Sequence, residues 1–332
     1  MNLKEKLLDY FMEHTDRIIS GQDLAQVFDV TRSAVWKAIE ELRNQGYIIE
    51  SISRKGYRLV KYSNDLDAQQ IMNQLSTDWE NLTIEVHDEV TSTNDLAKIF
   101  GVSHPKRTHL IIARKQTKGR GRYGKSFHSS IANGLYMSLL IPIKDIKIEN
   151  IPLITIATAT AMSEAIEELY GKTLAIKWVN DLFLEGRKVS GILCEALSDL
   201  ESRTISSVVV GLGLNLAGEF DQADEQVRSV AGTLFGEQLP KDFNYNELIS
   251  LYLNKLSGYI NHLEAREFIT YYSNHLLGIN TKVSYQSNGQ WHEGIIRGIN
   301  QQGHLLFEHE DGMLEELFGQ EIHLSSQQFA KE

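Results

Sequence analysis

The strongest chemical signature in this sequence lies in one loop, QTKGRGRYGKSFH, at residues 116–128. Its alternating glycines, Gly119 and Gly121, allow the backbone to change conformation and to approach a ligand closely. Arg120 and Arg122 carry planar, multi-donor groups that suit the oxygens of carboxylates and phosphates. The loop therefore predicts a site for an anionic, phosphate-bearing ligand. A basic nucleic-acid-binding loop, or a merely solvated one, is the alternative.

The same loop formally matches the P-loop pattern, from Gly119 to Ser126. A P-loop needs a strand that runs directly into the first glycine and a helix that starts at the Gly-Lys-Ser. Here the apolar run 110–113 ends early, and the turn signal Asn133-Gly134 follows too closely for a supporting helix. No later apolar strand ends in an aspartate of the kind that serves magnesium in an NTPase. We therefore expect the match to be accidental.

The loop must be held by a larger domain, and from Leu82 onwards apolar strand-like runs alternate with helical segments. This alternation predicts an α/β or α+β domain with a mixed sheet. The strand candidates are 84–87, 110–113, 135–141, 175–178, 189–195 and 207–210. The helix candidates are 151–170 and one or two helices within 246–277.

The first sixty residues have the pattern of three helices and a β-hairpin. Ser20-Gly-Gln-Asp23 resembles a capping box that opens a short helix, and Thr31 is placed to cap a longer one. The runs 47–52 and 57–60 predict two strands joined by a basic turn. Helices followed by such a hairpin predict a winged helix-turn-helix, with the helix-turn-helix running from Gly21 to Glu40.

A winged module of this kind predicts DNA binding, because its second helix presents a polar face and its wing a basic tip. The alternative is a helical scaffold whose exposed face is only solvated, with Trp36 as half-buried structure. The DNA-facing candidates are Arg32, Ser33, Trp36 and Lys37 on the helix, and Arg54 and Lys55 on the wing.

After Gly278 the sequence changes to short strand candidates separated by Asn-Gly, Gln-Gly and Asp-Gly turns. The candidates are 282–285, 291–299, 305–308 and 313–317. Turn signals at this spacing predict a small, SH3-like β-barrel. The expected organisation is α+β and multidomain: a winged helix-turn-helix at 1–62, a mixed-sheet catalytic domain at 63–277 that opens with a connector helix near 64–75, and a barrel at 278–332.

The composition limits the class of protein. A hydrophobic content of 42% and a net charge of -11 are typical of a folded, soluble protein and argue against a role in coating polyanions. The one cysteine, Cys194, excludes an intrachain disulfide, and its apolar neighbours predict an inert, packed thiol. The N-terminus lacks the apolar core of a signal peptide, and no apolar run is long enough to cross a bilayer. We expect a cytoplasmic protein with no membrane partner.

Five motifs follow one another along the chain: Ser92-Thr93-Asn94, Gly119-Arg-Gly-Arg122, Lys177-Trp-Val-Asn180-Asp181, Lys188-Val-Ser-Gly191-Ile-Leu and Gly211-Leu-Gly-Leu-Asn215. In order and spacing, with the two flanking modules, they resemble the bifunctional bacterial biotin protein ligases that also act as biotin operon repressors. The resemblance covers essentially the whole chain. It implies a catalytic domain of the biotin/lipoate ligase type.

The resemblance also implies an activity. Such ligases use ATP and Mg²⁺ to convert biotin to biotinyl-5′-AMP, and then transfer the biotinyl group to a lysine of the biotin carboxyl carrier protein of acetyl-CoA or pyruvate carboxylase. The adenylate-bound form is expected to become a homodimer that binds operator DNA as a repressor.

Site residues follow from the resemblance, position by position. The implied biotin-binding residues are Ser92, Thr93, Asn94, Gln116, Arg120, Gly121, Arg122, Lys188 and Gly191. The implied catalytic residues are Lys188, Arg120, Arg122 and Asp181. The implied nucleotide-binding residues are Arg122, Lys125, Asn180, Asp181, Gly213 and Asn215, with Asp181 also expected to meet Mg²⁺ through ATP.

Three positions depart from the family pattern. Val179 stands where proline is usual, which leaves one backbone N–H free. Lys125 replaces an expected arginine and cannot make a bidentate phosphate contact, and Phe127 replaces a tryptophan. Three rival functions remain at this point: a lipoate or octanoate ligase, a P-loop NTPase, and a transcription factor with a degenerate sensor domain.

Overall fold

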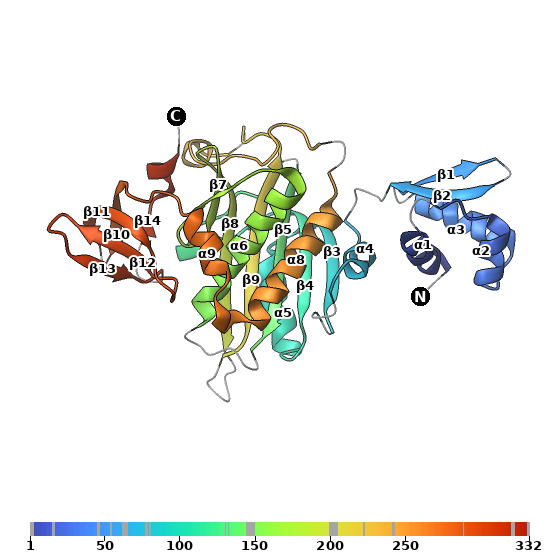
Figure 1. The fold of residues 1–332 in the computed structure, drawn as a ribbon, viewed down its shortest axis with the longest axis horizontal. Coiled ribbons are helices and arrows are strands. Elements are labelled where there is room, and N and C mark those ends of the chain that lie inside the picture. The colour runs from blue at the N-terminus through green and yellow to red at the C-terminus, as the bar shows by residue number, and fades with distance from the viewer. Residues whose placement is uncertain are drawn as a thin grey trace. The chain divides into compact units, whose positions relative to one another are not determined.

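The fold was analysed in a computed structural model, drawn in Figure 1. It describes residues 3–14, 17–44, 47–53, 55–61, 66–76, 79, 81–129, 131, 133–143, 150–198, 205–221, 223–240, 243–287, 289–319 and 323–330. The chain divides into two compact units, Met1–Leu75 with Asp242–Ser250, and Ser76–Lys241 with Leu251–Glu332. The three domain boundaries expected from the sequence stay a prediction.

The smaller unit contains the expected helices and hairpin. Its elements are α1 (Leu3–Glu13), α2 (Gly21–Val27), α3 (Arg32–Asn44), β1 (Ile48–Ile52), β2 (Gly56–Lys61) and α4 (Ala68–Asn73). The helices form because apolar residues recur on one face of each, and these faces meet in one core. That core includes Leu7, Phe11, Leu24, Val35, Ile39 and Leu42.

Local capping sets where these helices begin. The Ser20 hydroxyl accepts a hydrogen bond from the Asp23 backbone N–H at 3.0 Å, and the Thr31 hydroxyl accepts one from the Ala34 N–H at 3.2 Å. The antiparallel hairpin β1–β2 is anchored to the helices by Arg43, which donates to the Ile49 carbonyl. The predicted winged helix-turn-helix is therefore confirmed.

The larger unit is built on a seven-stranded mixed sheet. Its strands are β3 (Thr83–Val90), β4 (His109–Gln116), β5 (Asn133–Pro142), β6 (Ala175–Lys177), β7 (Asp181–Leu184), β8 (Arg187–Ser198) and β9 (Ile205–Ala217). The spatial order is β3-β4-β5-β9-β8-β7-β6. Only the β3–β4 pair is parallel, and the other pairs are antiparallel.

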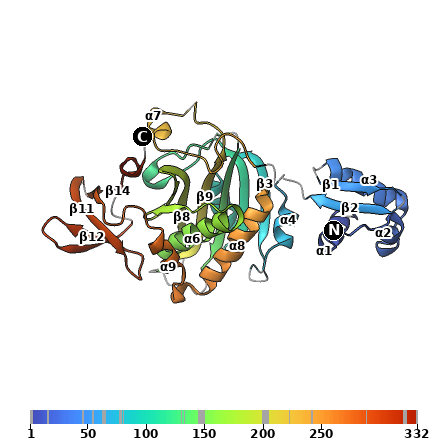
Figure 2. The ribbon, with the colours of Figure 1, turned by 45° about the horizontal axis from the view of Figure 1, so that its top comes forward.

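Helices cover both faces of this sheet (Figures 1 and 2). They are α5 (Thr93–Ser103), α6 (Ile151–Tyr170), α8 (Tyr245–Asn261, whose first residues belong to the smaller unit) and α9 (Phe268–Asn274), whereas the four-residue α7 (Glu225–Arg228) lies in the connection between β9 and α8. Along β8, Lys98 of α5 pairs with Glu195, whereas Cys194 lines a second cavity together with Thr155 of α6. Because neighbouring residues of a strand point to opposite faces, α5 and α6 cover opposite faces of the sheet.

Several sequence expectations for the domain predicted at residues 63–277 need correction. β9 does not end at Val210 but continues to Ala217, so the Gly-Leu-Gly-Leu-Asn motif is itself strand. β4 does not end at Ala113 but continues to Gln116, because it stays paired with β3 to that point. The helix α5 and the short strand β7 were not expected at all. The connector helix near 64–75 is the shorter α4, and residues 62–65 lie outside the described part of the chain.

The C-terminal part of the larger unit is a small antiparallel sheet, which confirms the predicted strands, whereas their closure into an SH3-like barrel stays a prediction. Its elements are β10 (Lys282–Ser287), β11 (Gln290–Ile299), β12 (Leu305–His309), β13 (Leu314–Leu317), β14 (His323–Leu324) and the 3-10 helix η4 (Ser326–Phe329). The order is β13-β12-β11-β10-β14. Gly303 and Gly312 have φ angles of 79° and 84°, which explains why glycine follows the polar residue in the predicted turns.

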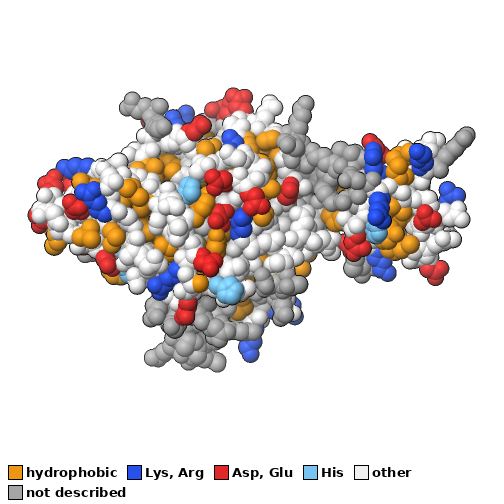
Figure 3. Space-filling model, in the orientation of Figure 1, with side chains coloured by type: hydrophobic (Ala, Val, Ile, Leu, Met, Phe, Trp, Pro, Cys, Tyr) orange, Lys and Arg blue, Asp and Glu red, His pale blue; other side chains and the backbone are white. Residues whose placement is uncertain are grey.

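The charges on the surface and the limited apolar length of the helices agree with the composition of the sequence. On the face shown in Figure 3, acidic and basic side chains of the larger unit are interspersed, without a continuous basic surface among the described residues. No helix within the described ranges is long and apolar enough to span a membrane.

Candidate active site

The motifs of the larger unit meet at one cavity of about 170 Å³. It is lined from α5, from the 116–127 loop, from the β6–β7 turn, and from β8 and β9. Every residue proposed for biotin, catalysis or nucleotide lines this cavity, with the exception of Asn215. The buried Asn215 instead donates from its Nδ2 to the Gly232 carbonyl at 3.2 Å.

The arginine loop folds back on itself instead of opening a helix. Phe127 N–H donates to the Gly119 carbonyl at 2.9 Å, and Gly121 N–H donates to the Lys125 carbonyl at 2.7 Å. Between them lies only a 3-10 turn, η1 (Arg122–Gly124). A Cβ at Gly119 would lie 2.3 Å from the Ser129 hydroxyl, so this close approach requires glycine. No α-helix starts at the Gly-Lys-Ser, which confirms that the P-loop match is accidental.

The ring of Phe127 rests on two glycines of the neighbouring strands. A Cβ on Gly213 would lie 2.7 Å from this ring, and a Cβ on Gly191 would lie 2.9 Å from it. The Lys188 ammonium lies 5.9 Å from the ring centroid. The two glycines therefore provide the space in which the loop closes over the sheet.

A polar network forms one wall of the cavity. The Thr93 N–H and hydroxyl both donate to Gln116 Oε1, at 2.8 and 3.1 Å, and Ser138 donates to Thr93 Oγ1 at 2.7 Å. The Asn94 amide is used within the fold, because it accepts from Ser138 and donates to Glu195. The Gln116 amide is used within the fold too, because its Nε2 donates to the Ser129 hydroxyl at 3.2 Å, so this network holds the wall in a fixed arrangement.

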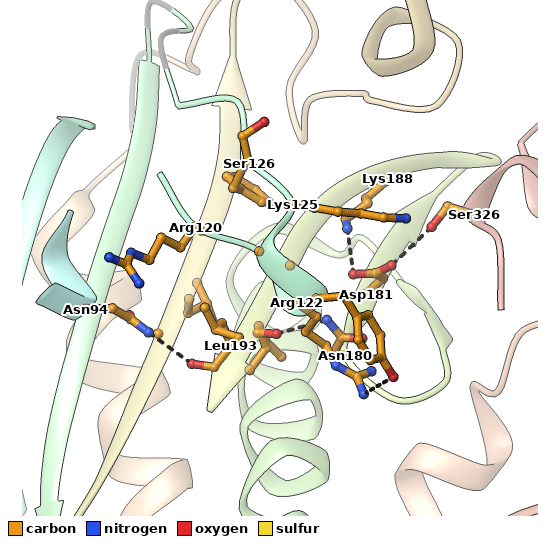
Figure 4. Close-up of a pocket in the computed structure, with 18 of the residues that line it drawn as sticks. Asn94, Arg120, Arg122, Lys125, Ser126, Asn180, Asp181, Lys188, Leu193 and Ser326 are labelled. Carbon is orange, nitrogen blue, oxygen red and sulfur yellow. Dashed lines mark hydrogen bonds and ion pairs between the residues drawn. The ribbon is translucent and has the colours of Figure 1, made fainter. Parts of the chain in front are cut away.

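The chemical centre of the cavity is the buried carboxylate of Asp181, which is only 4% exposed. Lys188 Nζ lies 2.6 Å from its Oδ1, and Lys177 Nζ lies 3.1 Å from its Oδ2. The hydroxyl of Ser326, from the C-terminal sheet module, donates to the same Oδ2 at 3.1 Å. Figure 4 shows Lys188 and Ser326 pointing at Asp181 from two sides.

The charges of this cluster are set by competition between burial and pairing. Burial alone would raise the pKa of Asp181, but the attraction of Lys188 and Lys177 outweighs it and holds that pKa well below its usual range. Burial lowers the pKa of Lys177, against the opposing attraction of Asp181. Asp181 is therefore a weakly basic, permanently charged carboxylate at neutral pH.

The two loop arginines have different partners. Arg122 donates from Nη1 to Asn180 Oδ1 at 3.1 Å and from Nη2 to the Gly319 carbonyl. Arg120 Nε pairs with Asp95 Oδ2 at 3.1 Å and remains about half exposed. Lys125 lines the cavity with an exposed side chain.

Sequence reasoning missed several residues of this site, among them Lys177, Trp178 and Ser326 in the cavity lining and Asp95, which pairs with Arg120. Lys177 could have been found, because Lys177 and Asp181 face each other across the tight β6–β7 turn. Asp95 lies next to a motif that was recognised. Ser326 has no local signature, since it lies 145 positions after Asp181 in the chain. Cys194 is no nucleophile in this setting, because burial raises the pKa of its thiol to about 11.

The DNA-facing candidates lie on the smaller unit. Arg32, Ser33 and Lys37 are exposed on α3, and Trp36 is 53% exposed, so about half of it is buried and its two expected roles both stay predictions. Lys55 is exposed in the wing turn. The wing candidate Arg54 lies outside the described residues.

Comparisons with known proteins agree with both units. Residues 86–215 match the Biotin/lipoate A/B protein ligase family, and residues 4–58 match an HTH domain. The chain is 31% identical to the Bifunctional ligase/repressor BirA of Bacillus subtilis, over 97% of this chain and 98% of that protein. It is 29% identical to the Bifunctional ligase/repressor BirA of Escherichia coli, over 92% and 93% of the two chains.

A solved structure supports the same assignment. The chain resembles the biotin protein ligase from Aquifex aeolicus in complex with biotin and ATP, with a TM-score of 0.61 and 28% identity. The match covers 74% of this chain and all of that one. Because the relatives match over nearly their whole length, and both the ligase cavity and the winged module are present, this chain belongs to the family of bifunctional biotin protein ligase/repressors.

Proposed function

We propose that the cavity around Asp181 and Lys188 activates biotin with ATP to form biotinyl-5′-AMP, and then transfers the biotinyl group to a lysine of a biotin carboxyl carrier protein of acetyl-CoA or pyruvate carboxylase. The observation that carries this proposal is the pair of the buried Asp181 with the partly exposed Lys188, 2.6 Å apart, beside two arginines in one cavity. Ligands of these types fit the family: the Aquifex aeolicus ligase was solved with biotin and ATP.

In the first step a biotin carboxylate oxygen attacks the α-phosphorus of ATP, the bond from that phosphorus to the bridging oxygen breaks, and pyrophosphate leaves. Two anions must approach each other, so positive charge is needed between them. Lys188 supplies that charge, held in place by Asp181, and Arg120 and Arg122 are near enough on the loop to assist. Preorganised charge of this kind stabilises the transition state without a general base.

Substrate placement follows from the same lining. We assign the biotin head group to the Ser92, Thr93 and Gln116 wall, because its fixed donors and acceptors match a polar ring system. We assign the nucleotide to the side of Asn180, Gly213 and Lys125, with Asn215 behind that wall as a supporting residue. The Phe127 ring, seated on Gly191 and Gly213, covers the cavity and keeps water from the mixed anhydride.

In the second step the lysine amine of the carrier attacks the carbonyl carbon, the bond to AMP breaks, and the amine loses a proton. Because the pKa of Asp181 lies well below its usual range, this carboxylate is a poor proton acceptor. The carrier lysine therefore loses one proton to solvent before it attacks as a neutral amine, and the proton that it carries after the attack also passes to solvent, while Asp181 stays paired with Lys188 and Lys177.

Mg²⁺ was expected to meet Asp181, and the residues here do not fit a protein-held ion. Both oxygens of Asp181 already face lysines, and no group of three or more His, Cys, Asp or Glu suited to a metal occurs among the described residues. The ammonium groups of Lys177 and Lys188 would repel a divalent cation bound to the same carboxylate. A magnesium ion carried by the triphosphate needs no such cage, because phosphate oxygens and water suffice.

The smaller unit completes the proposal. We propose that the adenylate-bound protein forms a homodimer that binds operator DNA through α3 and the wing and represses transcription, and that it acts in the cytoplasm, where ATP, carrier and operator are found together. The exposed Arg32 and Lys37 on α3 support the DNA contact. A contact of Lys37 with a DNA phosphate would set the register of the protein on the duplex, and Arg32 could contact the edges of the bases.

The decisive experiment is ATP–pyrophosphate exchange with biotin, lipoate or no acid. We expect exchange that depends on biotin alone. Exchange driven by lipoate would instead indicate a lipoate ligase, and hydrolysis of ATP to ADP without exchange would revive the NTPase hypothesis. Biotin binding without any exchange would leave a sensor domain with no ligase activity.

A further inference from the structure

The C-terminal sheet module reaches into the cavity of the catalytic sheet. Leu324 and Ser326 line that cavity, and the Ser326 hydroxyl donates to Asp181 Oδ2. The Gly319 carbonyl accepts from Arg122 and, at 3.1 Å, from the Tyr123 hydroxyl. The module therefore contacts Asp181 and Arg122, two of the charged groups of the proposed chemistry. A purely supporting domain has no need of such contacts.

Ser326 is held in position independently of Asp181. At the start of η4, the Ser325 hydroxyl accepts from the Gln327 N–H at 3.3 Å. Gln328 fixes the same short helix to β10 by exchanging two hydrogen bonds with the Ser284 backbone, each 2.7 Å long. Because these contacts fix the segment by themselves, the Ser326 hydroxyl is free to act on the carboxylate.

We propose that Ser326 is a positioning residue for the adenylation step. It acts through Asp181, so this inference rests on the proposed function. Its hydroxyl and Lys177 hold Oδ2, which turns Oδ1 toward Lys188. A carboxylate anchored at one oxygen keeps its other oxygen, and the ammonium group paired with it, in one place. Without Ser326 the carboxylate has one anchor fewer, and the Lys188 ammonium is less well aimed at the reacting groups.

The test measures kcat and KM for biotin and ATP in pyrophosphate exchange. For Ser326→Ala we expect kcat to fall roughly tenfold, as for loss of a hydrogen bond to a charged group, with KM for biotin nearly unchanged. Ser326→Cys keeps the size of the side chain and should lose as much, whereas Ser326→Thr should restore most of the rate. The thermal midpoint of each variant shows that it is folded.

Two control variants separate positioning from support. Ser325→Ala and Gln328→Ala weaken the anchoring of η4 without removing the group that contacts Asp181. Because they loosen the segment but keep the Ser326 hydroxyl, they should lose clearly less of the kcat than Ser326→Ala does. The inference is wrong if Ser326→Ala and Ser326→Cys match the wild type, or if both controls lose as much rate. If the wild type itself shows no biotin-dependent exchange, it is the proposed function that fails.

Discussion

The charged side chains of the catalytic cavity and those of α3 are arranged in opposite ways. In the cavity, Asp181 is buried between Lys177 and Lys188, and each of its two carboxylate oxygens is paired with an ammonium group. On α3, Arg32 and Lys37 are exposed, and no ion pair of either is found among the described residues. A buried, paired charge is preorganised for chemistry and costly to disturb, whereas an exposed charge is available to a large external partner. The two regions should therefore respond to mutation in different ways.

The largest effect is expected from Lys188→Ala. Removing the charge between two approaching anions should slow pyrophosphate exchange by about 10²- to 10³-fold, the usual loss for one transition-state donor. Lys172→Ala removes a lysine of the same unit that does not line the cavity, and it should leave the rate unchanged. Steady-state exchange rates check both. Equal rates for Lys188→Ala and the wild type would contradict the assignment of this lysine.

The next effect concerns the exposed region alone. Arg32→Ala combined with Lys37→Ala should weaken binding to a duplex selected with the wild-type protein by roughly 100-fold, since each such contact is worth about 1–3 kcal/mol. Biotin-dependent exchange should be unchanged. Gel-shift titrations with biotin and ATP present give the affinity, and exchange rates on the same preparations give the activity.

A charge-matched control sharpens this experiment. Lys4→Ala combined with Lys6→Ala removes the same charge from α1, outside the proposed contact face. Its loss of affinity should be at most about threefold, the effect of long-range charge alone. If the two double variants lose affinity equally, α3 makes no specific contact. If exchange is lost together with DNA binding, the two functions are not separable.

A smaller effect should follow from filling the space under Phe127. Gly213→Ala places a Cβ 2.7 Å from the ring, so the loop must shift, and exchange should fall roughly tenfold, as expected for overpacking. Adding Phe127→Leu should recover part of the loss, because a smaller side chain relieves the contact. Gly258→Ala, where a Cβ meets nothing within 4 Å, is the control and should keep full activity.

The smallest effect is the pH dependence of stability. Because the folded pKa of Asp181 lies below its ordinary value of 3.8, the unfolded chain binds more protons between the two values. The pairing of Asp181 therefore stabilises the fold fully above its ordinary pKa of 3.8. As the pH falls below that value, the free energy of unfolding decreases by up to about 1.4 kcal/mol per pH unit. Urea unfolding of the wild type and Asp181→Asn from pH 6 to 2.5 measures it. The stability difference between them should shrink toward acid; a constant difference would exclude this pairing.

Much of the molecule follows from local patterns. The helix-turn-helix was predictable because capping residues and apolar faces at Ser20, Thr31 and Val35 act within one or two turns of the chain. The C-terminal strands were predictable because their turns need glycine at a positive φ, as at Gly303. Strand ends were not predictable in the same way. β9 continues through its glycines because β5 and β8 pair with it on both sides.

The sequence by itself determined which residues we propose for the chemistry and for DNA: the Gly-Arg-Gly-Arg loop, Lys188, Asp181 and the polar face of α3. Their types and spacing were sufficient, since charge and hydrogen-bonding capacity belong to the side chains. Only the tertiary structure decided what surrounds them. It brings Ser326 to Asp181, seats Phe127 on Gly191 and Gly213, and buries Lys177 beside the carboxylate. These contacts join segments far apart in the chain, and their geometry depends on strand register and domain packing, for which no local pattern exists.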